Sequence, residues 1–103
     1  MNIVIDIDGT ICNTPEDKNY HECTAKLDNI DKSNKLYDEG HYIIYWTARG
    51  SSSKIDWEEI TERQLERWGV RYHELRFGKP SYDKWIDDKA INVEDWDENI
   101  CNS

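Results

Sequence analysis

Basic residues and long apolar runs are both scarce in this sequence. The 103 residues include 13 Lys and Arg against 22 Asp and Glu, which gives a formal net charge of −9. A protein that holds long nucleic acid by its phosphates needs a basic face, so this balance argues against a polynucleotide as partner. No apolar stretch approaches the roughly 20 residues that a membrane span requires. We therefore expect no membrane partner, and an anionic substrate would need a local cation.

Proline and glycine are also few, at two and five residues, and they form no linker. The chain is therefore expected to form one domain over residues 1–103. Its first residues lack the basic start and long apolar segment of a secretory signal, which predicts a cytoplasmic protein. The three cysteines, Cys12, Cys23 and Cys101, show no CxxC spacing, so we expect free thiols rather than a disulfide framework or a zinc site.

What the chain does contain is an alternation of strand and helix patterns. Runs of strand length lie at residues 3–7, 42–46, 73–77 and 84–86, and helical spacing occurs at 29–39, 56–68 and 93–99. This alternation predicts an α/β fold in which right-handed crossovers cover both faces of a mainly parallel sheet. The least regular part, residues 9–28, is predicted to be a flap over the site.

Polar side chains follow each predicted strand. Ligands bind outside the carboxyl ends of the strands in such sheets, so these residues are expected to converge at one edge. In chain order they are Asp6 and Asp8, then Thr47, then Lys79, then Asp87 and Asp88.

Asp6 and Asp8 are two residues apart, so on a strand their side chains point to the same side. Two carboxylates this close repel each other, which tends to keep one protonated unless a cation sits between them. One acid could then act as a nucleophile while its neighbour carries a proton for a leaving group. Together with Asp87 and Asp88 they offer hard oxygen ligands of the kind that Mg²⁺ prefers.

The remaining residues at this edge suit a phosphoryl group, whose transfer depends on charge stabilisation and in-line positioning. Thr47 can donate a hydrogen bond to a phosphate oxygen, Lys79 offers a charged donor, and the amide of Ala48 can add another. The pattern predicts transfer of a phosphoryl group to an aspartate and then to water, with Asp8 as general acid and then base. Arg49 could contact another part of the substrate, although a surface arginine paired with an acid is an equal alternative.

The sequence Asp6-Ile7-Asp8-Gly9-Thr10 resembles the first motif, DxDGT, of the haloacid dehalogenase (HAD) superfamily of phosphohydrolases. Thr47, Lys79 in "FGKP" and Asp87-Asp88 in "WIDDKA" are similar to its second, third and fourth motifs, in the same order over residues 3–90. The resemblance implies a three-layer α/β/α Rossmann-like core. About 38 residues separate the first two motifs and about 31 the next two, so no cap domain is expected.

The resemblance also implies roles. Asp6 would form the aspartyl-phosphate, Asp8 would be the general acid and base, and Thr47 and Lys79 would bind phosphate. Asp6, the Asp8 main-chain carbonyl and Asp87 would hold Mg²⁺, with Asp88 either a further ligand or a residue that orients them. Without a cap, a neighbouring subunit would shield the intermediate, so a homo-oligomer is expected.

Three functions stay open at this point. The stretches "LYDEGHYIIYWTARG" and "GKPSYDKWIDDKA" resemble small bacterial phosphatases of capsule and surface-polysaccharide synthesis, which implies a small sugar or polyol phosphate as substrate. A nucleotidase or nucleic-acid end phosphatase is the alternative within the same enzyme class. From another class comes a receiver-like signalling module that accepts phosphate on an aspartate without being a hydrolase.

Overall fold

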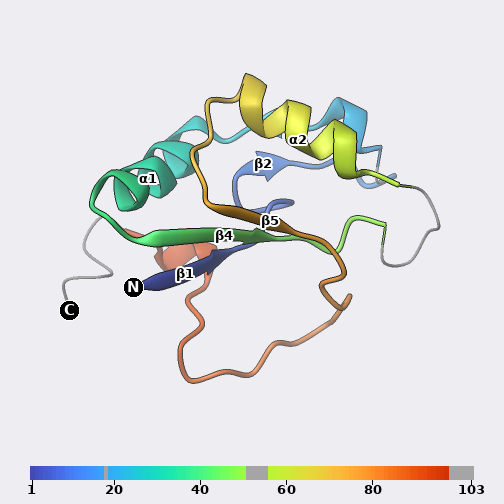
Figure 1. Cartoon of the computed structure of the whole chain (residues 1–103). Coiled ribbons are helices and arrows are strands. Elements are labelled where there is room, and N and C mark those ends of the chain that lie inside the picture. Colours follow the sequence, from blue (N-terminus) through green and yellow to red (C-terminus); the bar gives the residue numbers. More distant parts are fainter. Residues whose placement is uncertain (18, 51–55, 98–103) are drawn as a thin grey trace.

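A parallel three-stranded sheet forms the centre of the protein (Figure 1). The computed structural model describes residues 1–17, 19–50 and 56–97. The sheet has the order β1 (Asn2–Ile5), β4 (Tyr42–Trp46), β5 (Glu74–Arg76), and both strand pairs are parallel. The three predicted strands are confirmed within two residues at each end, and the carboxyl ends of β1, β4 and β5 share one edge.

Two α-helices connect these strands, α1 (Leu27–Asp38) between β1 and β4 and α2 (Glu58–Arg67) between β4 and β5. Both lie on the same face of the sheet (Figure 1). The order β1-β4-β5 explains this, because two right-handed crossovers that step in the same direction place their helices on one face. The described residues put no α-helix on the other face, so the α/β fold is shown, whereas the predicted three-layer core is not confirmed.

The hydrophobic core lies between the sheet and the two helices. Ile43 and Tyr45 are fully buried and alternate along β4, so they point to the same face. They pack with Leu36 of α1 and Leu65 of α2 in one cluster. On the other face Val4 of β1 remains 57% exposed.

Part of the segment predicted as a flap belongs to the core. Ile11 and Cys12 are fully buried. A small antiparallel pair, β2 (Cys12–Asn13) with β3 (Thr24–Ala25), encloses a single 3-10 turn at Tyr20–Glu22. Residues 9–28 thus place buried side chains beside the end of β1.

The predicted fourth strand at 84–86 is wrong. All residues from 80 to 92 are exposed and none of them forms a strand, and Ile86 is 98% exposed. The three-residue run is too short to define its own structure, and none of its residues pairs with the sheet. The predicted helix at 93–99 is only a 3-10 turn, Val93–Asp95, and its last two residues lie outside the described part.

Candidate functional site

Asp6 and Asp8 lie where β1 ends and the chain turns. Ile7 between them is fully buried, and its carbonyl accepts hydrogen bonds from the amides of Thr10 and Ile11 at 3.1 and 2.9 Å. Gly9 makes this turn with a φ of +79°, a conformation that side chains with a Cβ rarely adopt. The buried isoleucine therefore anchors a tight turn that holds both carboxylates at the edge of the sheet.

Lys79 reaches the same edge from the end of β5. Its Nζ lies 3.6 Å from Oδ2 of Asp6, and its side chain is only 12% exposed. The chain enters this position through Gly78, whose φ is +83°. The amide of Lys79 donates to the carbonyl of Thr47 at 3.1 Å. The structure thus brings together the predicted nucleophile and the predicted phosphate-binding lysine.

Thr47 directly follows β4 and is fully buried. Its amide donates to the Arg76 carbonyl at 2.9 Å, and its Oγ1 accepts the Arg49 amide at 3.2 Å. The hydroxyl proton can still be donated, as a phosphate-binding role requires. Ala48, the other predicted phosphate contact, follows Thr47 in the loop and is half-buried.

Arg49 is placed differently from the expectation that it contacts substrate. Its Nε and Nη2 donate to the two carboxylate oxygens of Asp8 at 3.0 and 2.9 Å. Its Nη1 donates to Thr61 and Gln64 of α2 at 3.0 and 2.6 Å, and the residue is 2% exposed. The guanidinium also lies 4.6 Å from the ring centroid of Tyr20. In this arrangement the guanidinium of Arg49 positions Asp8.

These contacts give the two carboxyl groups different acidities. Burial raises the pKa of Asp6 above its ordinary value, against the opposing effect of Lys79. Burial acts on Asp8 in the same direction, but the hydrogen bonds and charge of Arg49 outweigh it, so the pKa of Asp8 is lowered. The pKa values of the two carboxyl groups therefore differ, as expected, and Asp8 rather than Asp6 is the more readily ionised group.

Asp87 and Asp88 are not brought to this edge. Both are exposed, and Asp87 accepts only from its own segment, from the Trp85 indole at 3.5 Å and the Lys89 amide at 3.0 Å. The groups predicted to hold Mg²⁺ are thus split between two places, with Asp6 and the Asp8 main-chain carbonyl at the end of β1 and both Asp87 and Asp88 in an exposed segment. As arranged in this structure, the donors do not fit a Mg²⁺ ion.

Several residues around Asp8 were not predicted. Thr14 donates to Oδ1 of Asp8 at 2.6 Å, and the thiols of Cys12 and Cys23 lie 3.5 and 3.8 Å from the same oxygen. Burial raises the pKa of the Cys12 thiol to about 12. The sequence could have indicated the roles of Thr61 and Gln64, because these polar residues lie on the face of α2 that also carries the apolar Leu65. No comparable signal marks Thr14 or the cysteines.

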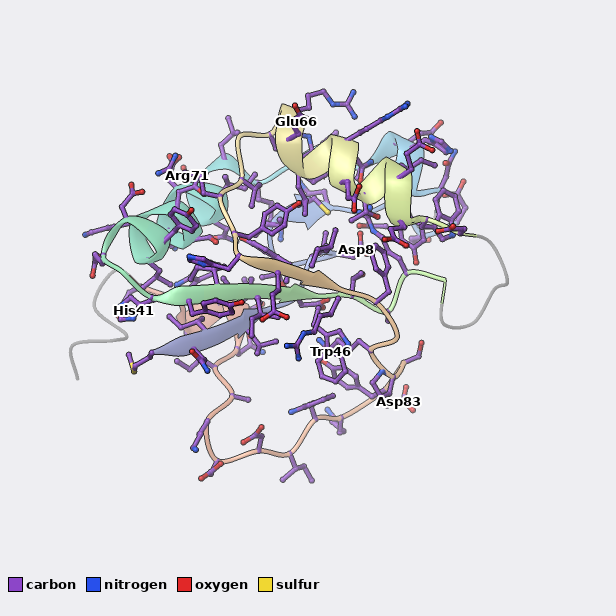
Figure 2. All side chains as sticks on the ribbon, in the orientation of Figure 1. Asp8, His41, Trp46, Glu66, Arg71 and Asp83 are labelled. Carbon is purple, nitrogen blue, oxygen red and sulfur yellow. The ribbon has the colours of Figure 1, made fainter. Side chains whose placement is uncertain are left out.

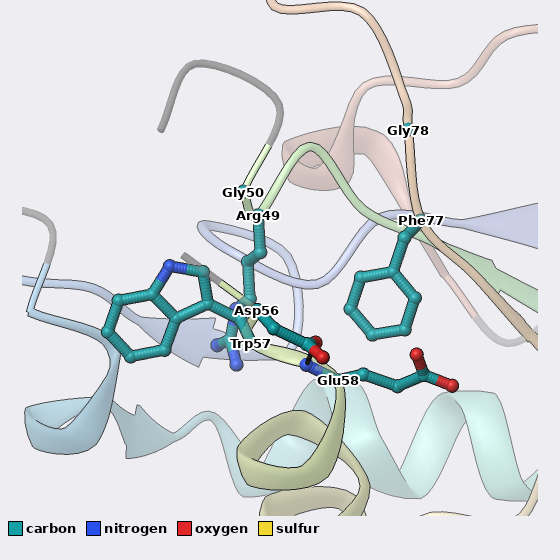
Figure 3. A pocket seen from close by; sticks show the side chains of 7 residues that line it. All are labelled: Arg49, Gly50, Asp56, Trp57, Glu58, Phe77 and Gly78. Atoms are coloured by element: carbon teal, nitrogen blue, oxygen red, sulfur yellow. Dashed lines mark hydrogen bonds between the residues drawn. The ribbon is translucent and has the colours of Figure 1, made fainter. Parts of the chain in front are cut away.

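A hollow of about 210 Å³ borders this site (Figure 3). Arg49 and Gly78 form its inner side, next in sequence to the candidate phosphate-binding residues. The aromatic rings of Trp57 and Phe77 line it, together with two acids. In Figure 2, Asp8 lies beneath α2 at the same end of the sheet. The hollow therefore combines apolar rings with carboxylates that can accept hydrogen bonds.

The described residues of the chain include no helix long and apolar enough to cross a membrane. Cys101, which the sequence predicts to be a free thiol, lies outside the described residues.

Comparison with known proteins gives one informative likeness. No family model and no curated protein matches this chain. A crystal structure described only as an MCSG target from Vibrio cholerae superposes with a TM-score of 0.77 and 26% sequence identity. The match covers 90% of this chain and 84% of that chain. This likeness shows that the protein shares its α/β fold with the Vibrio cholerae protein.

Proposed function

We propose that the protein is a phosphomonoesterase that works through an aspartyl-phosphate on Asp6. The observation that carries this proposal is the 3.6 Å approach of the Lys79 ammonium to the Asp6 carboxylate at the carboxyl ends of the parallel strands. An ammonium there can bind the phosphate of a substrate while the carboxylate attacks phosphorus. The buried Thr47 can add a hydroxyl donor to the same group.

In the first step an Asp6 oxygen would form a bond to phosphorus while the bond from phosphorus to the ester oxygen breaks, and the ester oxygen would leave as an alcohol with a proton taken from solvent. In the second step water would lose a proton to Asp8 and attack phosphorus, which breaks the bond to Asp6 and releases phosphate. The ion pair with Arg49 keeps Asp8 ionised, which suits the second step. Esters with good leaving groups, which need little protonation, should therefore be the better substrates.

The hollow beside the site supports a small sugar or polyol phosphate. Trp57 and Phe77 can contact the carbon skeleton of such a compound, and Asp56 and Glu58 can accept hydrogen bonds from its hydroxyls. The same two acids repel additional phosphates, which disfavours a nucleoside diphosphate or a nucleic-acid end. A role in surface-polysaccharide synthesis rests on the sequence resemblance alone.

Dependence on Mg²⁺ is a separable part of the proposal. Its support is the acidic sequence at residues 6–8 and 87–88, because in this structure these donors are not gathered. Residues 80–92 would have to move toward β1 for Asp87 to reach Asp6. Shielding of the intermediate by a second copy of the chain is likewise a proposal, which sedimentation at assay concentration would test; a monomer alone would argue against it.

A second candidate is favoured by one contact. Arg49 occupies both oxygens of Asp8, and a carboxylate held in this way has little freedom to shuttle protons. Asp6 could then accept a phosphoryl group without rapid turnover, as in a phospho-accepting signalling module.

The test is phosphate release from an aryl phosphate and from a panel of sugar, polyol and nucleotide monophosphates, each with Mg²⁺ or with EDTA. Asp6→Asn should abolish release, whereas Asp31→Asn, a change at an exposed acid of α1, should leave it unchanged. Equal activity in wild type and Asp6→Asn would refute the mechanism. No release from any ester, together with stable labelling of Asp6 by acetyl phosphate, would establish the signalling module instead.

A further inference from the structure

Two cysteines meet beside Asp8, Cys12 in β2 and Cys23 directly before β3. Cys12 pairs with Ala25 and Asn13 with Thr24, so Cys23 is a diagonal neighbour of Cys12 on the same face. Cys12 is fully buried, whereas Cys23 is half-buried. Both are free thiols in this structure.

The two sulfur atoms share their neighbours. Each lies close to Oγ1 of Thr14, at 3.6 Å for Cys12 and 3.4 Å for Cys23. The two sulfurs and an oxygen of Asp8 all lie within 4.8 Å of one another. A disulfide needs the sulfurs at about 2.05 Å, so each has to move by little more than an ångström, within a pair of two-residue strands.

The two thiols and the Asp8 carboxylate could also bind a soft metal ion, but the position of Arg49 argues against a metal site here. Its Nη2 lies 3.5 Å from the Cys23 sulfur and 3.9 Å from the Cys12 sulfur, and donates to Asp8 at 2.9 Å. A guanidinium therefore already supplies the positive charge between these ligands. A metal ion would have to displace an arginine that is also bonded to Thr61 and Gln64.

We propose that Cys12 and Cys23 form a reversible disulfide that controls the site next to them. The oxidant is a low-molecular-weight disulfide such as oxidised glutathione. The Cys23 thiolate attacks one sulfur of the reagent, forms a mixed disulfide and releases one thiol. The Cys12 sulfur then gives up its proton to solvent and attacks the Cys23 sulfur, which releases the second thiol. The protein loses two protons and two electrons, and the reagent gains them.

The disulfide would change the surroundings of Asp8. The reduced protein places two S–H groups beside Oδ1 of Asp8, and the disulfide has neither. Drawing the sulfurs together also shifts Thr14, which donates to the same oxygen. The expected loss of activity, which rests on the proposed function, is about tenfold, as for loss of hydrogen bonds to a charged group.

The experiment uses the full chain with Cys101→Ser as background, so that only the two cysteines in question can react. The protein is equilibrated with mixtures of reduced and oxidised glutathione, unfolded in the presence of an alkylating reagent and weighed by mass spectrometry. We expect two alkylation sites under reducing conditions, none under oxidising conditions, and a peptide that joins Cys12 to Cys23. Cys23→Ser in the same background should keep Cys12 alkylatable in every mixture.

Two alkylation sites in every mixture, or adducts that carry glutathione without an internal disulfide, would overturn the proposal. Phosphate release is measured in the same samples, with each protein compared only with itself across the mixtures. If the disulfide forms in an active protein and phosphate release does not change, the proposal that the disulfide controls the site is overturned. If no sample releases phosphate, the proposed function fails, and the mass measurement still decides whether the disulfide forms.

Discussion

At the scale of residues, Asp6 and Asp8 show how two identical side chains acquire different properties within one turn. Asp6 is half-buried beside a lysine at 3.6 Å, and its pKa is raised. Asp8 receives two donors from one guanidinium, and its pKa is lowered. A bidentate arginine outweighs burial where a single, more distant ammonium does not.

This difference predicts opposite effects of the same substitution. A carboxyl with a lowered pKa stabilises the fold above its unfolded value of about 4 and loses that contribution as pH falls through its folded pKa. A carboxyl with a raised pKa reduces stability as pH rises from about 4 through its folded pKa. At pH 7 we therefore expect Asp8→Asn to lower the free energy of unfolding by about 1.5–3 kcal/mol and Asp6→Asn to raise it.

Urea unfolding of both variants and the wild type between pH 3 and pH 8 tests this expectation. The difference between Asp8→Asn and wild type should shrink as pH falls below about 4, because the Asp8 carboxyl of the unfolded chain then takes up a proton while the folded protein still holds it ionised. If Asp6→Asn is less stable than the wild type at pH 7, Lys79 stabilises the Asp6 carboxylate by more than burial destabilises it, and the raised pKa of Asp6 is wrong.

At the scale of elements, α2 combines packing with support of the site. Leu65 is fully buried in the core, and Thr61 and Gln64 on the same helix are bonded to Arg49. The position of α2 on the sheet therefore also sets the position of Arg49 and, through it, of Asp8.

Leu65→Ala should lower the free energy of unfolding by about 2–5 kcal/mol, because it leaves a cavity between α2 and the sheet. Leu27→Ala is the matched control, since Leu27 begins α1 and is 65% exposed; its effect should stay within about 0.5 kcal/mol. Chemical denaturation measures both. Equal effects of the two substitutions would mean that α2 does not pack on the sheet as described.

At the scale of the whole molecule, the excess of acids over bases makes the chain repel itself. The formal net charge is −9, and the described surface ion pairs, such as Glu59 with Arg63, are exposed and contribute little. The pair of Asp8 with the buried Arg49 is shielded from salt by comparison. Salt should therefore act mainly by screening repulsion.

We expect NaCl to raise the unfolding temperature gradually and MgCl₂ at equal ionic strength to raise it further if the acids gather around the ion. At a Mg²⁺ concentration of ten times the dissociation constant, binding adds about 1.4 kcal/mol to the free energy of unfolding. Each kcal/mol raises the unfolding temperature of a domain of this size by about 4–8 °C. Asp6→Asn should remove the additional effect of Mg²⁺ but keep that of NaCl. If both salts have the same effect on the wild type, Mg²⁺ binds at no specific site.

Part of this protein could be read from its sequence. The helical period of α1 and α2 and the five apolar residues of β4 are local patterns, and local patterns also place Asp6, Asp8, Thr47 and Lys79 at strand ends. Once the strands are parallel, these ends share one edge, so the approach of Lys79 to Asp6 follows from topology.

Only the tertiary structure decided the rest. Arg49 pairs with Asp8 across a long stretch of sequence, and Cys12 meets Cys23 as a diagonal neighbour in a hairpin. No local sequence pattern encodes either contact. The segment at 84–86 failed as a strand for the same reason, because a short strand forms only where a neighbour supplies its hydrogen bonds. Sequence thus determined which groups stand at the edge of the sheet, and packing decided which of them are paired, buried or left in solvent.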